Sequence, residues 1–356
     1  MNHSPIVIIG AGLTGLTTAY LLEKDGIPST IIEARNRPGG RIHTLYQNGR
    51  NPVEMGAAWL GTKHTALNHL LSELEIPVFE QFTDSKAFIK AGKSAPPQQI
   101  PLPADSEPSY RIKGGSFRLI ETLADQLEKS RILYNEPVSS ITFDNNTARV
   151  KTSSQSIPAE RVITTIPPKL LVNRISFNPD LPEILCNTAA STDTWMGDAI
   201  KFALRYETPF WREDGSTGTL LGYSQEAPII EMYDHSGNGD SPTYFALKGF
   251  LQEHYHDYST EQRKELIINE LTQVYGDQAN DYSSYHETVW RDEPFTFAES
   301  EETLIPHQNN GAPVFHTPHM NGRLIIGGSE TAPAYPGYME GAVQSARKIY
   351  QIVSEK

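Results

Sequence analysis

Residues 5–44 constrain the fold of this chain more than any other segment. Residues 5–9 are an unbroken apolar run, and Gly10, Gly12 and Gly15 follow at GxGxxG spacing where a helix should begin. The first glycine permits a tight turn, the second lets the backbone approach a pyrophosphate, and the third lets the helix pack closely on the strand. The free N–H groups at the helix start then face the phosphates. The pattern predicts a strand–turn–helix unit that binds a dinucleotide.

An acidic residue stands at the distance that such a unit requires. Residues 29–32 predict a second strand, which ends in Glu33, 23 residues after Gly10. A carboxylate at this distance is placed to accept hydrogen bonds from a ribose and disfavours a 2′-phosphate there. GxGxxG alone is a weak signal. Here it follows an apolar strand, opens a helix that Gly26 can end and has its acid in place, so the context favours binding over a purely structural turn.

The residues that follow Glu33 distinguish a flavin from a nicotinamide. They read EARNRPGGRIHT, with the glycine pair Gly39 and Gly40 followed by Arg41. Nicotinamide dehydrogenases usually carry no second glycine pair and arginine here. The segment closely resembles the flavin amine oxidase family, which includes monoamine oxidases, polyamine oxidases and L-amino-acid oxidases. The resemblance implies a bound FAD and an amine as substrate.

Four further segments resemble this family, in the family's order and over the whole chain. They are residues 54–61 (EMGAAWLG), similar to the segment beside the flavin; 113–127, similar to a helix entry; 162–168 (VITTIPP), similar to a strand ending in IPP; and 322–348, similar to the segment that closes over the isoalloxazine ring. The resemblance implies these FAD-binding residues: Gly10, Gly12, Leu13, Thr14, Gly15, Glu33, Ala34, Arg35, Gly40, Arg41, Gly56, Ala57, Ala58, Trp59, Val138, Trp290, Glu330, Tyr338 and Met339.

The charge balance restricts the partners of the protein. Among 356 residues, 30 are Lys or Arg and 43 are Asp or Glu, a net charge of −13. An acidic surface repels nucleic acid and acidic membranes and mildly attracts cationic amines. The single cysteine, Cys186, precludes an intrachain disulfide, and no cluster of residues indicates a metal site. The first strand begins within five residues and no apolar run approaches ~18 residues, so we expect a cytoplasmic protein without a signal peptide or membrane anchor.

The length and the motif order predict an α/β protein with two discontinuous domains. We expect a Rossmann-like FAD-binding domain of residues 1–78, 111–190 and 291–356, and a smaller α+β substrate domain on a mixed sheet, of residues 79–110 and 191–290. Alternating polarity over residues 199–207 and 243–251 predicts strands. Residues 260–276 predict a helix capped by Thr260 and ended by Gly276.

Residues 94–108 are rich in proline and polar residues and predict a loop. In larger members of the resembled family this region holds a long helical insertion over the substrate cavity, whereas about 30 residues, near 80–110, occupy it here. Flavin oxidation of an amine requires a dry site. A partner subunit in a homo-oligomer, the proline-rich loop and the substrate itself remain the candidates for the cover.

Lys201, in MGDAIKFAL, is similar in position to the family's lysine that hydrogen-bonds through a water to flavin N5. The resemblance implies a catalytic residue that orients water, assists reoxidation by oxygen and handles the departing proton. A lysine at a strand end can instead extend its head to solvent. Matches at Ala199 and Phe202, and in the following ETPFW, favour the catalytic interpretation.

Tyr338, in PGYMEGAV, resembles the aromatic residue that forms one wall of a cage facing the flavin. An aromatic face there guides an amine and stabilises its cationic form, so the resemblance implies a second catalytic residue. The alternative is an ordinary core aromatic at a helix start. A helix beginning near Gly337 would direct its positive end at the pyrimidine edge of the flavin.

The opposite wall departs from the family pattern. Trp290 opens WRDEPFTFAES, which resembles the family's tryptophan and the turn after it. The usual aromatic falls at Ser300, and the covalent-attachment cysteine of monoamine oxidases falls at Glu299, so we expect FAD to be held non-covalently. The substrate pocket is then half-open unless Phe295 or Phe297 turns into it. Core packing of these aromatics is the alternative.

Two residues serve the rest of the cofactor in this interpretation. Val138 resembles the family's backbone contact to adenine, and Glu330 is expected to meet ribityl or phosphate groups. A buried strand valine and a helix-flanking acid are the alternatives.

These expectations favour an FAD-dependent oxidase that converts an amine C–N bond to an imine by hydride transfer to flavin N5, with oxygen reduced to hydrogen peroxide. Two other functions stay open. The open roof and Ser300 suggest a flavin-dependent desaturase or dehydrogenase of a bulky hydrophobic substrate. A non-catalytic flavin-binding protein would retain the fold alone.

Overall fold

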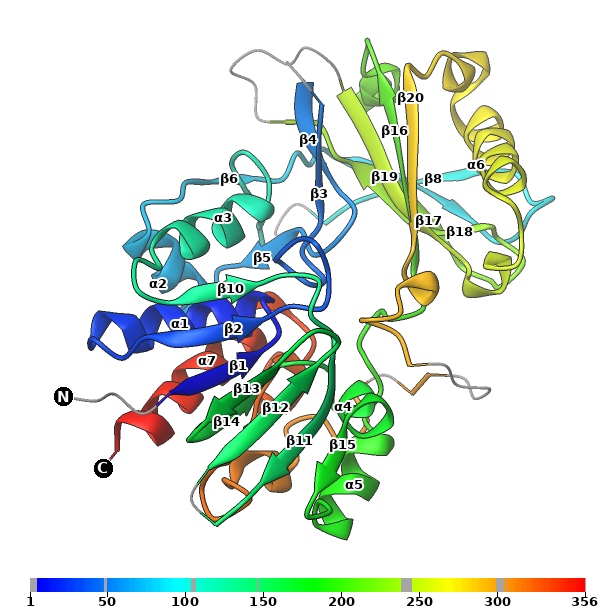
Figure 1. Cartoon of the computed structure of the whole chain (residues 1–356). Coiled ribbons are helices and arrows are strands. Elements are labelled where there is room, and N and C mark those ends of the chain that lie inside the picture. The colour runs from blue at the N-terminus through cyan, green and yellow to red at the C-terminus, as the bar shows by residue number, and fades with distance from the viewer. Residues whose placement is uncertain are drawn as a thin grey trace.

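A five-stranded parallel sheet forms one half of the molecule (Figure 1). The computed structural model describes residues 5–47, 50–103, 107–145, 147–237, 245–298, 304–305 and 307–355. The strand order is β10 (Arg131–Leu133), β2 (Ser29–Ile32), β1 (Ile6–Ile9), β14 (Arg161–Thr164) and β21 (Leu324–Ile326). Strands β1 and β21 are apolar at every position because such a sheet is covered on both faces.

Two different layers cover this sheet. Ile8 and Ile31 pack against the helices α1 (Leu13–Lys24), α2 (Thr65–Glu73), α3 (Phe117–Asp125) and α7 (Met339–Ser354). Val7 and Ile9 point to the other face, since side chains alternate along a strand. There they meet α4 (Pro168–Arg174), α5 (Glu183–Ala190) and a four-stranded sheet of β13 (Ser156–Ala159), β12 (Ala148–Thr152), β11 (Val138–Phe143) and β15 (Ser176–Asn178).

A seven-stranded mixed sheet forms the other half of the molecule (Figure 1). Its order is β20 (Ser284–Val289), β16 (Ile200–Tyr206), β19 (Phe245–Leu251), β18 (Ile229–Asp234), β17 (Ser216–Gly222), β7 (Lys86–Lys90) and β8 (Gln98–Pro101). The pair β17 and β7 is parallel and the other pairs are antiparallel. Helix α6 (Thr260–Tyr275) covers one face, where Ile267 and Leu271 join a core with Phe202 and Leu247.

Short elements connect the two halves. The hairpin of β3 (Thr44–Gln47) and β4 (Arg50–Glu54) leads to Met55, which packs on Ala203 of the seven-stranded sheet. A three-stranded sheet contains β5 (Trp59–Gly61), β9 (Ser109–Ile112) and β6 (Val78–Glu80). The described residues also contain six 3-10 helices: η1 (Phe210–Gly215), η2 (Glu253–Tyr255), η3 (Asp277–Asn280), η4 (Trp290–Asp292), η5 (Pro313–His316) and η6 (Ser329–Thr331).

The structure corrects two local predictions. Helix α6 is capped by Ser259 and not by Thr260, because the Ser259 side chain accepts from the Gln262 N–H and the Gln262 side chain accepts from the Ser259 N–H in a capping box. The proline-rich segment is not entirely a loop, since Gln98–Pro101 forms β8. Proline is tolerated in β8 because it is an edge strand, so a missing N–H breaks no ladder on its outer side.

The predicted strands over residues 199–207 and 243–251 contain β16 and β19, and Gly276 ends α6 with φ of 80°. Strands β7 and β8 join the seven-stranded sheet, whereas β6 and β9, at the ends of the 79–110 segment, pair with each other and β9 also with β5. The two-domain division remains a proposal. Among the described residues, no helix combines the length and the apolar character needed to span a bilayer.

Candidate active site

The turn between β1 and α1 has the geometry that its three glycines require. Gly10 adopts φ of 104°, and a Cβ on Gly15 would lie 2.0 Å from the Gly10 carbonyl oxygen. These two positions therefore exclude side chains for reasons internal to the fold. Gly12 is different, because a Cβ there would meet no atom within 4 Å. The open space beside Gly12 belongs to a cavity and leaves the N-terminus of α1 accessible to a ligand.

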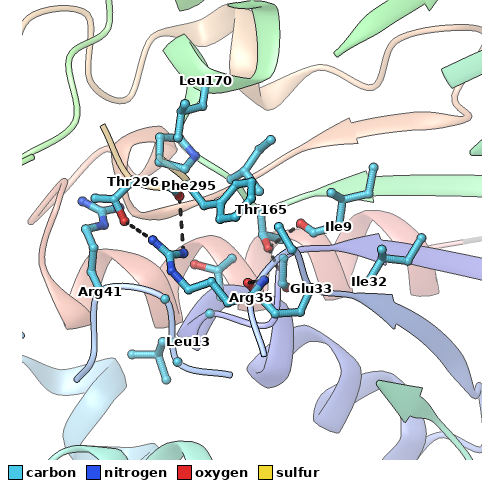
Figure 2. Close-up of a pocket in the computed structure, with 18 of the residues that line it drawn as sticks. Ile9, Leu13, Ile32, Glu33, Arg35, Arg41, Thr165, Leu170, Phe295 and Thr296 are labelled. Carbon is cyan, nitrogen blue, oxygen red and sulfur yellow. Dashed lines mark hydrogen bonds between the residues drawn. The ribbon is translucent and has the colours of Figure 1, made fainter. Parts of the chain in front are cut away.

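This cavity has a volume of about 400 Å³ and runs along the ends of β1 and β2 (Figure 2). It is lined by segments from the start, middle and end of the chain. The predicted cofactor residues that line it are Gly10, Gly12, Leu13, Thr14, Glu33, Ala34, Arg35, Gly40, Arg41, Ala57, Val138, Tyr338 and Met339. The predicted residues outside its lining are Gly15, Gly56, Ala58, Trp59, Trp290 and Glu330.

Glu33 is held rigidly at the wall of the cavity. One carboxylate oxygen accepts from the Ala11 N–H at 2.8 Å and the other from the Arg35 N–H at 2.9 Å. The side chain is almost fully buried at the end of β2. The backbone bonds orient the carboxylate while leaving lone pairs for hydroxyl donors of a ligand.

The Glu330 carboxylate binds an arginine of the same chain in this structure. Its carboxylate accepts two bonds from Arg41, at 2.6 and 2.8 Å, and one from the Ser329 hydroxyl at 2.8 Å. Burial raises the pKa of Glu330, but the charge and hydrogen bonds of Arg41 outweigh it and lower the pKa overall. Arg41 and Ser329 line the cavity, whereas Glu330 lies behind them. We interpret Glu330 as the residue that orients Arg41.

Lys201 lies on β16, almost fully buried, next to the segment that reaches the cavity. Its Nζ donates to the Gly56 carbonyl at 2.9 Å and lies 5.2 Å from the centre of the Phe250 ring. Burial lowers the pKa of Lys201 to about 8; Glu54 opposes this change and Arg41 adds to it. Lys201 therefore does not extend to solvent. A buried amine with this pKa is partly uncharged near neutral pH and can accept a proton.

Trp290 and Lys201 hold the same stretch of backbone. The Trp290 indole donates to the Met55 carbonyl at 2.9 Å, adjacent to the Gly56 carbonyl that Lys201 binds. A Cβ on Gly56 would lie 2.1 Å from the Arg41 carbonyl oxygen, so this stretch also packs tightly on the Arg41 loop. These contacts fix Ala57 in the lining of the cavity.

Tyr338 is the N-cap residue of α7, lines the cavity and is 41% exposed. Two rings that the sequence analysis missed stack with it. Trp195 lies 5.9 Å from Tyr338 at 29°, and His307 lies 6.4 Å from it at 9°, measured between ring centres and planes. Trp195 can approach Tyr338 because Gly337 has no side chain; a Cβ on Gly337 would lie only 2.4 Å from the Trp195 Cβ. The sequence signal that could have identified Trp195 is an aromatic residue six positions before Lys201. No feature of the sequence singled out His307.

The two phenylalanines expected at the second wall lie elsewhere. Phe295 lines the cavity but faces Arg35, whose guanidinium carbon is 5.6 Å from the ring centre (Figure 2). Phe297 is almost fully buried, lies outside the cavity lining and has Arg291 over its ring at 5.0 Å. Core packing therefore accounts for Phe297. Ser300 and Glu299 lie outside the described residues.

Comparisons with known proteins identify the family of this chain. The sequence profile described as Flavin containing amine oxidoreductase matches residues 13–107 and 91–349. A probable flavin-containing monoamine oxidase A of Dictyostelium discoideum is 23% identical, with 99% of this chain and 97% of that protein covered. The amine oxidase [flavin-containing] B of Mus musculus is 24% identical, with 98% and 85% covered.

Solved structures show the same fold. A putrescine oxidase bound to putrescine superposes with a TM-score of 0.85 at 22% identity, and the cyclohexylamine oxidase of Brevibacterium oxydans IH-35A with 0.86 at 19%; each comparison covers 99% of both chains. The expected α/β fold, with a Rossmann-like domain and a substrate domain, is confirmed, and so is an oxidoreductase that acts on amines with a flavin. The profile match extends over most of the chain and shows that it belongs to the flavin containing amine oxidoreductase family.

Proposed function

We propose that this protein is an FAD-dependent oxidase that converts an amine to an imine and reduces oxygen to hydrogen peroxide. The observation that carries the proposal is the position of Lys201: an almost fully buried amine, bonded to Gly56, beside the wall of a dinucleotide cavity. FAD supplies the redox chemistry, because its isoalloxazine accepts a hydride at N5 and passes the electrons to oxygen.

The residues of the cavity fit this cofactor. The open space at Gly12 and the N-terminus of α1 suit a pyrophosphate, and the Glu33 carboxylate suits ribose hydroxyls. Arg41, oriented by Glu330, adds a fixed positive charge to the lining. The N-terminus of α7 has no side-chain cap, so its N–H groups can stabilise negative charge on a bound ring. We propose that Val138 contacts the adenine.

Lys201 and Tyr338 have different roles in the proposal. The uncharged Lys201 amine accepts a proton or holds a water in a dry environment, since its burial lowers its pKa toward neutrality. Tyr338, stacked with Trp195, presents a ring face at the cavity that can guide an amine. Trp195 and His307, which are outside the cavity lining, are proposed to hold the Tyr338 ring in place by stacking with it.

We further propose that FAD is held non-covalently. Cys186 is the chain's single cysteine; it lies on α5, where its thiol contacts the Leu181 carbonyl, and it does not line the cavity. A reducing compartment such as the cytoplasm is compatible with this lone thiol and is the location we propose.

The test begins with the visible spectrum of the purified protein loaded with FAD. Anaerobic addition of a panel of primary, secondary and acidic amines should bleach the flavin with at least one of them, and air should then restore the colour and release peroxide. Lys201→Met should slow bleaching or recolouring without loss of flavin. A chain that stays colourless with added FAD, or a loaded protein that no amine bleaches, would contradict the proposal.

A further inference from the structure

The seven-stranded sheet has two chemically different faces. The face toward α6 is apolar, with Phe202 and Leu247 in its core. The opposite face carries Lys201 and Lys248 on neighbouring strands, since Lys201 pairs with Phe250 and Lys248 pairs with Ala203. Residues paired across strands share a face. Lys248 is therefore a diagonal neighbour of Lys201, which the proposed function places at the reaction centre.

Lys248 is buried without a hydrogen-bond acceptor among the described residues. It is 1% exposed, and its Nζ lies 5.9 Å from the centre of the Tyr233 ring. Lys90, another buried lysine of the same sheet, bonds Glu270 and Gln273, both at 2.7 Å. The comparison shows how this fold satisfies a structural lysine. Burial and the charge of Lys201 hold the pKa of Lys248 well below its ordinary value, although Glu54 opposes them.

Two more buried donors face the same region. The Trp59 indole N–H and the Arg111 Nε–H have no acceptor among the described residues. The Trp59 ring lies 4.1 Å from the Tyr233 ring, and Arg111 is the cross-strand partner of Trp59. Arg111 directs its other nitrogens to His235, with Nη1 3.0 Å from the ring Nδ1. Trp59 on β5 and Lys248 on β19 thus both lie beside the Tyr233 ring, and Arg111 on β9 pairs with Trp59.

The nearby carboxylates do not accept hydrogen bonds from these donors. Glu54 uses one oxygen for the Thr44 hydroxyl at 2.7 Å and the other for the Ser116 N–H. Glu231, on β18, makes no hydrogen bond or ion pair within 4 Å with Lys248. Buried donors without acceptors are costly, so they call for a partner such as a ligand group, an ion or a water. Trp59 and Phe250, which flank the region, are half-buried.

We propose that Lys248, with Trp59 and Arg111, binds the carboxylate of an amine substrate. The substrate class is then an amine that carries an acidic group, such as an α-amino acid, with its nitrogen toward Lys201 and its carboxylate on Lys248. The inference rests on the proposed amine oxidase function and names the substrate of that site. A carboxylate there accepts from all three donors and offsets the buried positive charge.

The first test compares pairs of substrates that differ by the carboxylate alone, with FAD-loaded enzyme. Phenylalanine and 2-phenylethylamine form one pair, and leucine and 3-methylbutylamine another. The acidic member should have a kcat/KM higher by about tenfold or more. Lys248→Met should reduce this preference, because KM of the acid should rise relative to KM of the neutral amine. Lys248→Arg should retain part of it.

The second test needs no turnover. Titration of the loaded protein with 3-phenylpropionate should perturb the flavin spectrum, and Lys248→Met should weaken this binding by about tenfold or more. Lys90→Met is the matched control, because it also removes a buried lysine of the sheet. It should lower Tm and leave the preference for acidic amines and the affinity for 3-phenylpropionate unchanged. Lys248→Gln repeats the test with a polar side chain if the methionine variant does not fold.

The outcomes separate the two proposals. Equal use of acidic and neutral amines, with 3-phenylpropionate binding unaffected by Lys248→Met, would overturn the carboxylate site and leave the amine oxidase intact. Binding of 3-phenylpropionate that depends on Lys248, without oxidation of any amine, would overturn the oxidase function and keep the acid site.

Discussion

Arg41 and Glu330 form a bidentate ion pair, with Nη1 to Oε1 at 2.6 Å and Nη2 to Oε2 at 2.8 Å. Glu330 is fully buried, and the Arg41 side chain is 26% exposed where it lines the cavity. The pair joins the loop after β2 to η6, near the end of the chain. It therefore orients a cation at the cavity and fastens two distant segments together.

Glu330→Gln should lower the free energy of unfolding by about 3 kcal/mol, because it leaves a largely buried guanidinium without its counterion. The net lowering of the Glu330 pKa means that the pair stabilises the fold fully above the ordinary value of 4.5 and progressively less as pH falls below it. In urea unfolding, the difference between wild type and variant should shrink in acid. Glu107→Gln, which removes a surface pair with Lys63, is the control and should leave stability unchanged.

Lys201 should make stability rise with pH. Its pKa is about 8 in the fold against 10.5 ordinarily, so between these values the unfolded chain binds a proton that the folded chain does not. At about 1.4 kcal/mol per pH unit, wild type should gain on the order of 3 kcal/mol over Lys201→Met across this window. If the difference in unfolding free energy between wild type and Lys201→Met stays constant from pH 7.5 to 10.5, the pKa of Lys201 is not lowered by folding. Turnover by wild type should also increase with a midpoint near pH 8.

Gly12→Ala and Gly15→Ala should fail in different ways. A Cβ on Gly12 meets no protein atom and enters the space proposed for the pyrophosphate, so FAD affinity should fall while the cofactor-free protein keeps its Tm. A Cβ on Gly15 collides with the Gly10 carbonyl, so that variant should lose stability by about 1–3 kcal/mol through backbone displacement. Flavin fluorescence titration and thermal unfolding measure the two effects. Equal losses of Tm would refute the assignment of Gly12 to the ligand.

Trp195→Ala should reduce kcat/KM for amines by about 3–10-fold, because an aromatic pair contributes about 0.5–1.5 kcal/mol beyond its buried area. The loss would follow from freeing Tyr338, with which Trp195 stacks. Trp195→Phe keeps a ring and should retain most of the activity. If both variants behave like wild type, the stack does not shape the site.

Short-range patterns predicted much of the fold. Strands β1 and β2, the start of α1 at the glycine turn and the approach of Glu33 to that turn all lie within residues 5–35, where spacing along the chain dictates geometry. The helix α6 was also predicted, with a one-residue error at its cap because Ser259 and Thr260 both suit that position and only the bond from Gln262 distinguishes them. The edge strand β8 was missed because its proline, Pro101, and the prolines around it favour a loop in isolation.

Partners far apart in the chain were beyond such patterns. The family resemblance predicts a cofactor contact for Glu330, which stays a prediction; the structure shows that its carboxylate bonds Arg41, 289 residues away. Phe297 matched an aromatic wall by position, yet packing buries it under Arg291. Trp195, His307 and Lys248 attracted no functional hypothesis, since nothing in their local sequence marks which side chains they face.

The sequence by itself determined the nucleotide-binding turn, the acid that accompanies it, the order of the family segments and hence the chemistry to expect. The turn and its acid depend on residues close together, whose geometry follows from helical and strand periodicity; the order of the segments and the chemistry rest on the family resemblance. The tertiary structure alone decided that Lys201 bonds Gly56, that Trp195 stacks on Tyr338 and that Lys248 shares a face with Lys201. Those relationships depend on strand register and on the packing of distant segments, in which many weak contacts must be satisfied together.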